Sequence, residues 1–151
     1  MKRIDAYGLS RVIEIGLIVM MIVVLGLMGT LPWSITWLTE RAPDDPYYIR
    51  YLVVLTYSGI MAELLLWQAR GIMHNVNHKC VFSADTVRRM RVAAVEFIVL
   101  ACFYFVTMFW LHKFFMAALF VCSVMGGCIL LVFAELFRQA NEYKEENDMT
   151  I

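Results

Sequence analysis

Four continuous apolar blocks constrain this chain more than any other feature of its sequence. They cover residues 12–31, 51–69, 92–111 and 114–133, and each is 19 or 20 residues long. A helix that rises about 1.5 Å per residue needs roughly 20 residues to cross the hydrocarbon core of a bilayer. Because backbone amides in lipid must bond within their own segment, the blocks predict four membrane-spanning helices.

Composition excludes the soluble alternatives. Of the 151 residues, 62% are hydrophobic, against about 45–50% in soluble domains, and a soluble domain of this size cannot bury so much apolar surface. Thirteen Lys and Arg balance thirteen Asp and Glu, which leaves no positive excess for direct nucleic-acid binding. The expected fold class is all-α, an integral membrane four-helix bundle. It forms one domain over 1–151, with helices at about 12–31, 51–69, 92–111 and 114–137.

The distribution of charge predicts the orientation. With both termini on one side, ten of the thirteen Lys and Arg residues lie on that side. The positive-inside rule then puts both termini in the cytoplasm, with 138–151 as an acidic cytoplasmic tail. The localisation expected from this pattern is a bacterial cytoplasmic membrane, crossed several times, with the lipid bilayer as the main partner.

The connections between the blocks carry local signals. The first outer loop is expected from Pro32 to Tyr48, and the second is expected to be only His112-Lys113. Ser83 reads as the N-cap of the third helix, with Phe82 packing onto Val87 as a hydrophobic staple.

One glutamate falls in or beside each apolar block, and each has an arginine three or seven residues away, on the same helical face. The pairs are Arg11/Glu14, Glu63/Arg70, Arg89/Glu96 and Glu135/Arg138. These acids form the candidate intramembrane polar site.

Glu63 and Glu96 lie deepest and, on antiparallel neighbours, at the same height. Two facing carboxyls in a low dielectric predict that one keeps its proton at pH 7. The pair is interpreted either as a proton or cation site or a polar switch, or as interhelical hydrogen-bonding groups for Ser58 and Tyr104.

Metal and enzyme chemistry have little support. His74 and His78 have i, i+4 spacing and Cys80 follows, which makes the two imidazoles weak metal-ligand candidates; solvated or headgroup-contacting side chains are the better interpretation. The sequence contains no nucleophile elbow and no glycine-rich phosphate loop. We therefore expect a non-enzymatic protein without a cofactor.

Two surfaces are candidates for contacts. Ser123 and Gly127 form a small-xxx-small pair, which predicts tight packing within the chain or across a homodimer. The connection between the second and third helices, residues 70–91, is basic, whereas the tail, residues 138–151, is acidic. Together they form a candidate partner-docking face on the cytoplasmic side, whose residues are Arg88, Arg91, Glu142, Glu145, Glu146 and Asp148.

The second half of the chain resembles a known family. Glu135-Leu136-Phe137-Arg138-Gln139, and then residues 144–151, KEENDMTI, are similar to the closing signature of the bacterial membrane family called domain of unknown function 2975. Phe82-Ser83, followed by Arg88, Arg89 and Arg91, resembles a second landmark of that family. The resemblance covers about Gly71 to Ile151. It implies four transmembrane helices and, for many members, a neighbouring helix-turn-helix transcription regulator, but no established activity.

Three functions follow from these features. The first is a non-enzymatic regulatory or sensory protein that docks a cytoplasmic partner such as a helix-turn-helix regulator. The second is a proton- or cation-linked transporter or channel that uses Glu63 and Glu96. The third is a membrane metal-binding protein that uses His74 and His78 with the acids.

Overall fold

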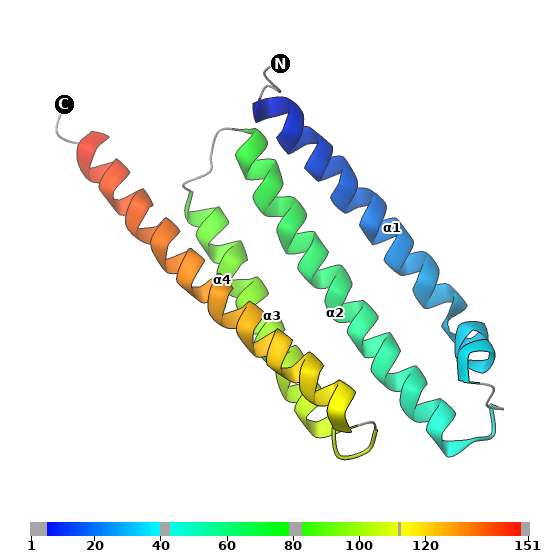
Figure 1. Ribbon diagram of the computed structural model, residues 1–151. Helices are drawn as coiled ribbons and strands as arrows, with labels where there is room; N and C mark the ends of the chain where they lie inside the picture. Colours follow the sequence, from blue (N-terminus) through cyan, green and yellow to red (C-terminus); the bar gives the residue numbers. More distant parts are fainter. Residues whose placement is uncertain (1–5, 40–42, 79–82, 112, 149–151) are drawn as a thin grey trace, which may run out of the picture.

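Four helices make up the protein, as the computed structural model in Figure 1 shows. The structure describes residues 6–39, 43–78, 83–111 and 113–148. Within these ranges there is no strand, and the helices are α1 (Ala6–Thr39), α2 (Pro46–Asn77), α3 (Ala84–Thr107) and α4 (Lys113–Asp148). All four are long and apolar enough to cross a membrane, which confirms the expected all-α class.

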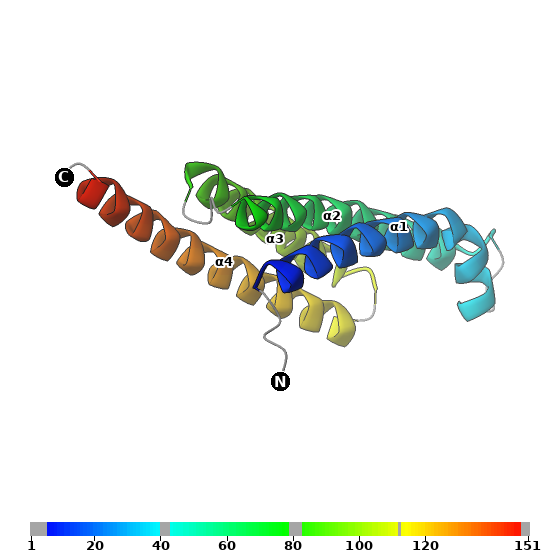
Figure 2. The same ribbon diagram turned by 90° about the horizontal axis from the view of Figure 1, so that it is seen from above.

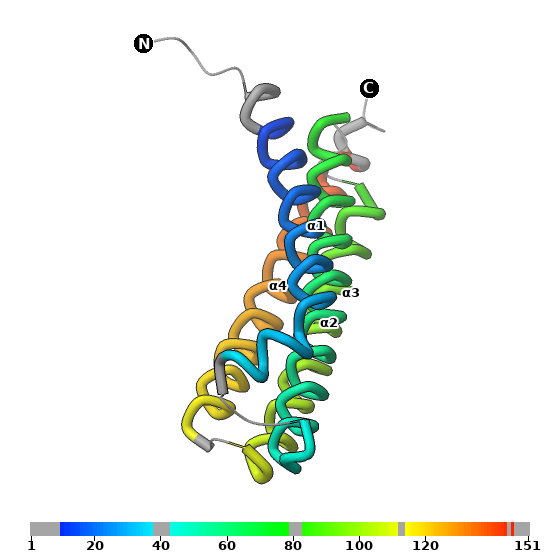
Figure 3. The backbone as a smooth tube through the Cα atoms, turned by 90° about the vertical axis from the view of Figure 1, so that its right-hand side faces the viewer, coloured from blue at the N-terminus to red at the C-terminus, as the bar shows by residue number. Residues whose placement is uncertain are grey.

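The helices run alternately up and down, so that both chain termini lie at one end (Figure 3). We call this the terminal end (residues 6–14, 67–78, 83–97 and 134–148) and the opposite end the loop end (residues 28–39, 46–61 and 100–120). Each helix packs on the next in sequence, and within the described ranges α1 and α4 make no close backbone contact. Figure 2 shows α1 and α4 displaced to the same side of the α2–α3 pair. The bundle is therefore open rather than a closed square.

The surface of the bundle is strongly apolar. The most apolar 18-residue window of α1 contains no buried residue, and side chains such as Ile22 and Leu27 are more than half exposed. Trp33, Trp37 and Trp110 are exposed at the loop end, and Trp67 is exposed toward the terminal end. Exposed apolar helices with tryptophan near both ends are typical of a multi-pass membrane protein.

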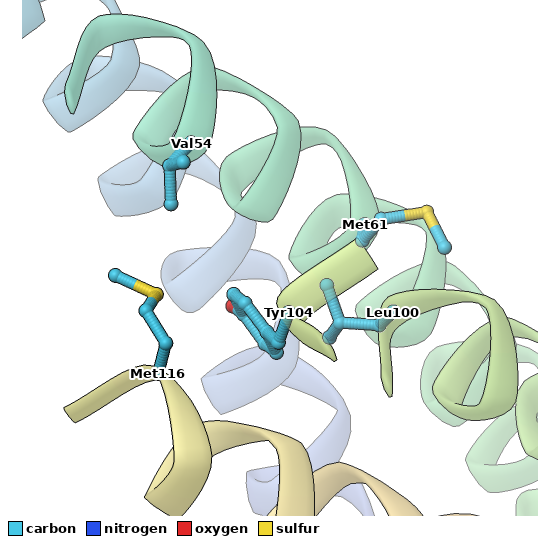
Figure 4. Packing of buried hydrophobic residues seen from close by; sticks show 5 residues of the cluster. All are labelled: Val54, Met61, Leu100, Tyr104 and Met116. Carbon is cyan, nitrogen blue, oxygen red and sulfur yellow. The ribbon is translucent and has the colours of Figure 1, made fainter. Parts of the chain in front are cut away.

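The best-packed region is at the loop end, where α2, α3 and α4 meet. Its buried cluster contains Val54, Met61, Leu100, Tyr104 and Met116, shown in Figure 4. The Tyr104 hydroxyl donates a hydrogen bond to Ser58 Oγ at 2.8 Å. Since the tyrosine satisfies its polar tip within the bundle, it packs as a core residue.

Small residues bring α4 close to α3. A Cβ on Gly127 would lie 3.3 Å from the carbonyl oxygen of Ala94, and one on Gly126 would lie 3.1 Å from Phe97. Ser123 is only 5% exposed. The Ser123/Gly127 face thus packs within the chain, which is the first of the two interpretations of this motif.

The helix boundaries differ from the expected ones at the loop end. α1 continues through Pro32 to Thr39, instead of ending at residue 31. Figure 1 shows its cyan end turned away from the rest of its axis, as expected where a proline removes one backbone donor. Asp45 then caps α2, accepting from Tyr47 N at 2.8 Å.

The α3–α4 connection is also longer than His112-Lys113. α3 ends at Thr107, because residues 108–110 form turns in which Trp110 N donates to Thr107 O at 3.0 Å. At the other end of α3, Ser83 is the N-cap as predicted, its hydroxyl accepting from Thr86 N. The expected Phe82 staple lies outside the described residues.

Candidate functional site

Polar and charged side chains gather at the terminal end. The structure brings three of the four predicted acids into hydrogen bonds there, but each acid has a different environment. Glu135 belongs to a surface ion network, Glu14 to a contact between α1 and α2, and Glu96 to a contact between α2 and α3. The predicted polar site is therefore several small sites and not one.

Glu135 has the predicted arginine partner. Arg138 Nε donates to Glu135 Oε2 at 3.0 Å, and Arg138 Nη1 donates to Glu142 Oε1 at 2.9 Å. Arg91 of α3 approaches the same carboxylate oxygen, with Nη2 at 3.8 Å from Oε2. This network connects α3 to α4 just where α4 leaves the apolar block.

A cleft of about 430 Å³ opens beside this network, between the start of α3 and the polar part of α4. Three arginines and one carboxylate provide its charge, so the lining is basic. Its residues are Ala84, Val87, Arg88, Arg91, Val92, Arg138, Asn141 and Glu142. Of the predicted docking face, Arg88, Arg91 and Glu142 line this cleft. The side chains of Glu145 and Asp148 lie outside the described residues, and Glu146 is exposed further along α4.

Glu14 contacts the end of α2 instead of its expected arginine. Asn77 Nδ2 donates to Glu14 Oε2 at 2.5 Å, and His74 Nδ1 lies 3.5 Å from Oε1. Arg11 lines the same cavity of about 400 Å³, but within the described chain no ion pair joins Arg11 to Glu14. The expected Arg11/Glu14 pair is therefore wrong, because the Glu14 carboxylate contacts the side chains of Asn77 and His74 of α2 instead.

Glu96 and Glu63 do not face each other, contrary to the sequence-based expectation. Gln68 Nε2 donates to Glu96 Oε1 at 3.4 Å. Five residues separate Glu63 from Gln68, which puts Glu63 about 140° around α2. It shares a side with Gly59, where a Cβ would press on Met28 of α1. Glu63 thus lies on the side of α2 that faces α1, whereas Glu96 of α3 contacts the side of α2 that carries Gln68.

The hydrogen-bonding interpretation of these acids also needs correction. Ser58 and Tyr104 bond to each other and therefore do not serve the carboxyls. Glu63 Oε1 and Glu96 Oε2 are both buried without a hydrogen-bond partner among the described residues. A buried oxygen without a donor is costly, so these two atoms are the unsatisfied buried side-chain atoms of the described residues.

The two deeper arginines lie apart from their predicted acids. Arg89 Nε donates to Asp85 Oδ2 at 2.8 Å, and the Arg70 guanidinium stacks over the ring of Trp67, 5.8 Å from its centroid. Seven residues, about 10 Å along a helix, separate each of these arginines from its glutamate.

His74 and His78 are neighbours, with ring centroids 4.4 Å apart and edge-to-face geometry. Among the described residues no group of three His, Cys, Asp or Glu side chains has the geometry to hold a metal ion. Cys80, the third ligand suggested by spacing, lies outside those residues.

Reasoning from the sequence missed the amide side chains. Gln68 bonds Glu96, Asn77 bonds Glu14, and Asn75 Nδ2 donates to both Asp85 (2.9 Å) and Thr86 (3.1 Å). The available signal was their presence on a single helix, where amides are expensive in lipid unless a neighbouring helix satisfies them.

Comparison with known proteins yields one match. The model of the family described as "Protein of unknown function (DUF2975)" matches residues 33–151, which confirms the resemblance inferred from the closing signature and extends it through α2. No curated protein and no solved structure matches the chain.

Proposed function

The chain belongs to the DUF2975 family of proteins of unknown function, and from that premise we propose that it is a non-enzymatic regulatory protein that docks a soluble partner at its terminal end. The proposal includes a bacterial cytoplasmic membrane as its location and the cytoplasm as the side of the terminal end. The observation that carries it is the basic cleft between α3 and α4.

The shape of α4 supports this role. Its apolar part ends near Phe137, yet the helix continues to Asp148. Eleven further residues extend it by about 16 Å, and Figure 1 shows this red end diverging from α3. The arm therefore stands clear of the bundle and forms one wall of the cleft.

The charge of the cleft indicates its partner. Arg88 has no carboxylate within salt-bridge distance in the described chain, whereas Arg138 is balanced by Glu135 and Glu142. An unbalanced guanidinium in a concave surface favours an acidic segment of the partner, because Arg binds carboxylates through two parallel hydrogen bonds. A helix-turn-helix regulator that presents an acidic helix meets this requirement.

A pull-down tests the proposal. The tagged full chain in detergent is compared with Arg88→Glu and with a chain truncated after Gln139, and the captured soluble proteins are quantified. We expect one partner to be captured by the full chain and reduced at least tenfold in both variants, because the first reverses the cleft charge and the second removes a wall. Arg11→Glu, at the same end but outside the cleft, is the control. Equal capture by all four proteins would refute docking here.

A second function has a specific observation in its favour. The buried, unpartnered oxygens of Glu63 and Glu96 suit transient binding of a proton or cation, which supports a proton- or cation-linked transporter or channel. In proteoliposomes with a pH gradient, this function requires a flux that Glu63→Gln or Glu96→Gln alters and that the surface control Glu142→Gln leaves unchanged. Absence of flux in the unmodified protein would eliminate it.

A further inference from the structure

A second basic pocket lies on the outer face of the α2–α3 pair, at the terminal end. It encloses about 220 Å³ and is lined by Trp67, Arg70, Gly71, His74, Asn75 and Arg89. A separate apolar cavity is lined by residues of all four helices, including Leu65 and Ala69 of α2. The α2 residues of the basic pocket lie on the opposite side of that helix. The pocket therefore opens outward, away from the interior of the bundle.

Arg89 lies against the backbone of α2 because residue 71 is a glycine. A Cβ at position 71 would collide with the Arg89 guanidinium, so any larger residue displaces this side chain. Nε of Arg89 is held by Asp85, but in the described chain its two terminal nitrogens donate no hydrogen bond. The Arg89 guanidinium is thus held in place, and its two terminal nitrogens remain able to donate hydrogen bonds to a ligand.

Arg70 supplies a second positive charge. Its guanidinium stacks over Trp67, and within the described residues it has no carboxylate in ion-pair distance. In the described part of the chain, Asp85 is the one carboxylate that pairs with either of the pocket's two arginines. Two arginines against one acid leave an excess positive charge, which an anion neutralises.

The depth of the pocket indicates the source of that anion. Trp67 is 54% exposed and lies near the end of the apolar block of α2, where tryptophan rings occupy the headgroup layer. Basic pockets between membrane helices at this level bind lipid headgroups, and the arginine fork matches phosphate oxygens. We propose that this pocket binds the phosphate of an anionic phospholipid.

This site is separate from the proposed docking cleft. Arg88 lies about 100° around α3 from Arg89, and the two pockets have no lining residue in common. Lipid binding and partner docking are therefore expected to fail independently, each in its own variant.

Lipid retention tests the proposal. The full chain is purified from nanodiscs of phosphatidylcholine containing one tenth phosphatidylglycerol, and the phosphatidylglycerol that stays with the protein after transfer to detergent is quantified by mass spectrometry. We expect selective retention by the unmodified chain, a loss of about fivefold or more in Arg70→Gln, and a similar loss in Gly71→Leu, which displaces Arg89. Arg70→Lys should retain an intermediate amount, because its ammonium keeps the charge but lacks the fork.

The controls separate the alternatives. Arg88→Gln, which removes a cation of the docking cleft, should retain phosphatidylglycerol like the unmodified chain. Thermal stability in detergent should rise with added phosphatidylglycerol and remain unchanged with inorganic phosphate. Equal retention by Arg70→Gln and the unmodified chain would overturn the proposal, as would equal stabilisation by inorganic phosphate, which would indicate a free anion instead of a lipid. Circular dichroism confirms that each variant is helical.

Discussion

The two ends of the bundle are built from the same helices but packed differently. At the loop end, Leu100 and Met116 are less than a tenth exposed in a cluster shared by three helices. At the terminal end, Ala94 and Ala134 are still buried, but beyond them α4 diverges from α3, with Arg91 Nη2 at 3.8 Å from Glu135 Oε2. The loop end is therefore the closed end, with an apolar cluster shared by three helices, and the terminal end is the open end, with pockets lined by charged side chains.

From this difference we expect the loop end to contribute most to stability and the terminal end to carry the binding sites. In lipid, helices associate through close packing and interhelical hydrogen bonds, since the hydrophobic effect no longer distinguishes one helix surface from the bilayer. The loop end and the α3–α4 contact around Gly127 supply such packing. At the terminal end, the charged side chains make polar contacts such as Gln68–Glu96 and Asn77–Glu14, and the arginines that line its pockets face outward. Changes of these arginines are therefore expected to affect binding more than unfolding.

The largest decrease in the free energy of unfolding is expected from a substitution that creates a cavity at the closed end. Leu100→Ala should lower the free energy of unfolding by about 2–4 kcal/mol, the usual cost of removing a buried leucine side chain. Leu136→Ala, at the open end and 54% exposed, is the matched control and should have little effect. Titration with SDS from mild micelles, followed by circular dichroism, measures both. If both variants lost the same free energy of unfolding, the two ends would not differ in packing.

A smaller loss is expected from overpacking at the α3–α4 contact. Gly127→Leu places a side chain where a Cβ already lies 3.3 Å from Ala94 O, and should cost about 1–3 kcal/mol. Gly16→Leu adds the same atoms to a face of α1 with nothing within 4 Å and should be neutral. The same titration distinguishes them, and a neutral Gly127→Leu would show that α4 is not held against α3.

The hydrogen bond between Tyr104 and Ser58 at the closed end should contribute still less to the free energy of unfolding. Tyr104→Phe removes the donor to Ser58 while keeping the ring, and an interhelical hydrogen bond in a membrane protein is worth about 0.6 kcal/mol. Tyr143→Phe, on the exposed arm of α4, should leave unfolding unchanged. A loss above about 2 kcal/mol for Tyr104→Phe would mean that this hydroxyl organises the core, contrary to its modest expected role.

The smallest effect is expected in the ion network of the open end. Glu142→Gln removes one exposed partner of Arg138, and exposed ion pairs stabilise proteins little. The unfolding midpoint should not move measurably, and helical content should be retained. A clear decrease in the midpoint would show that the α4 arm is part of the stable core, which would remove the distinction between the two ends.

Reasoning from the sequence succeeded where a single helix decides the outcome. The Ser83 cap and the Glu135/Arg138 pair depend on residues only three positions apart. It failed for Glu63 and Glu96, because an equal distance from the turn does not specify which face of α2 each acid occupies. It also placed the end of the first helix at Pro32, although a membrane helix continues through a proline at the cost of one hydrogen bond.

The sequence alone determined that this chain has four helices long and apolar enough to span a membrane, because 20 apolar residues in lipid have few options other than a helix. Tertiary structure decided which polar groups meet. The Asn77–Glu14 bond, the Gln68–Glu96 bond and the pocket formed by Arg70 and Arg89 depend on the rotation of α2 relative to its neighbours. That rotation is set by the summed packing of many side chains across helices, which no local pattern records.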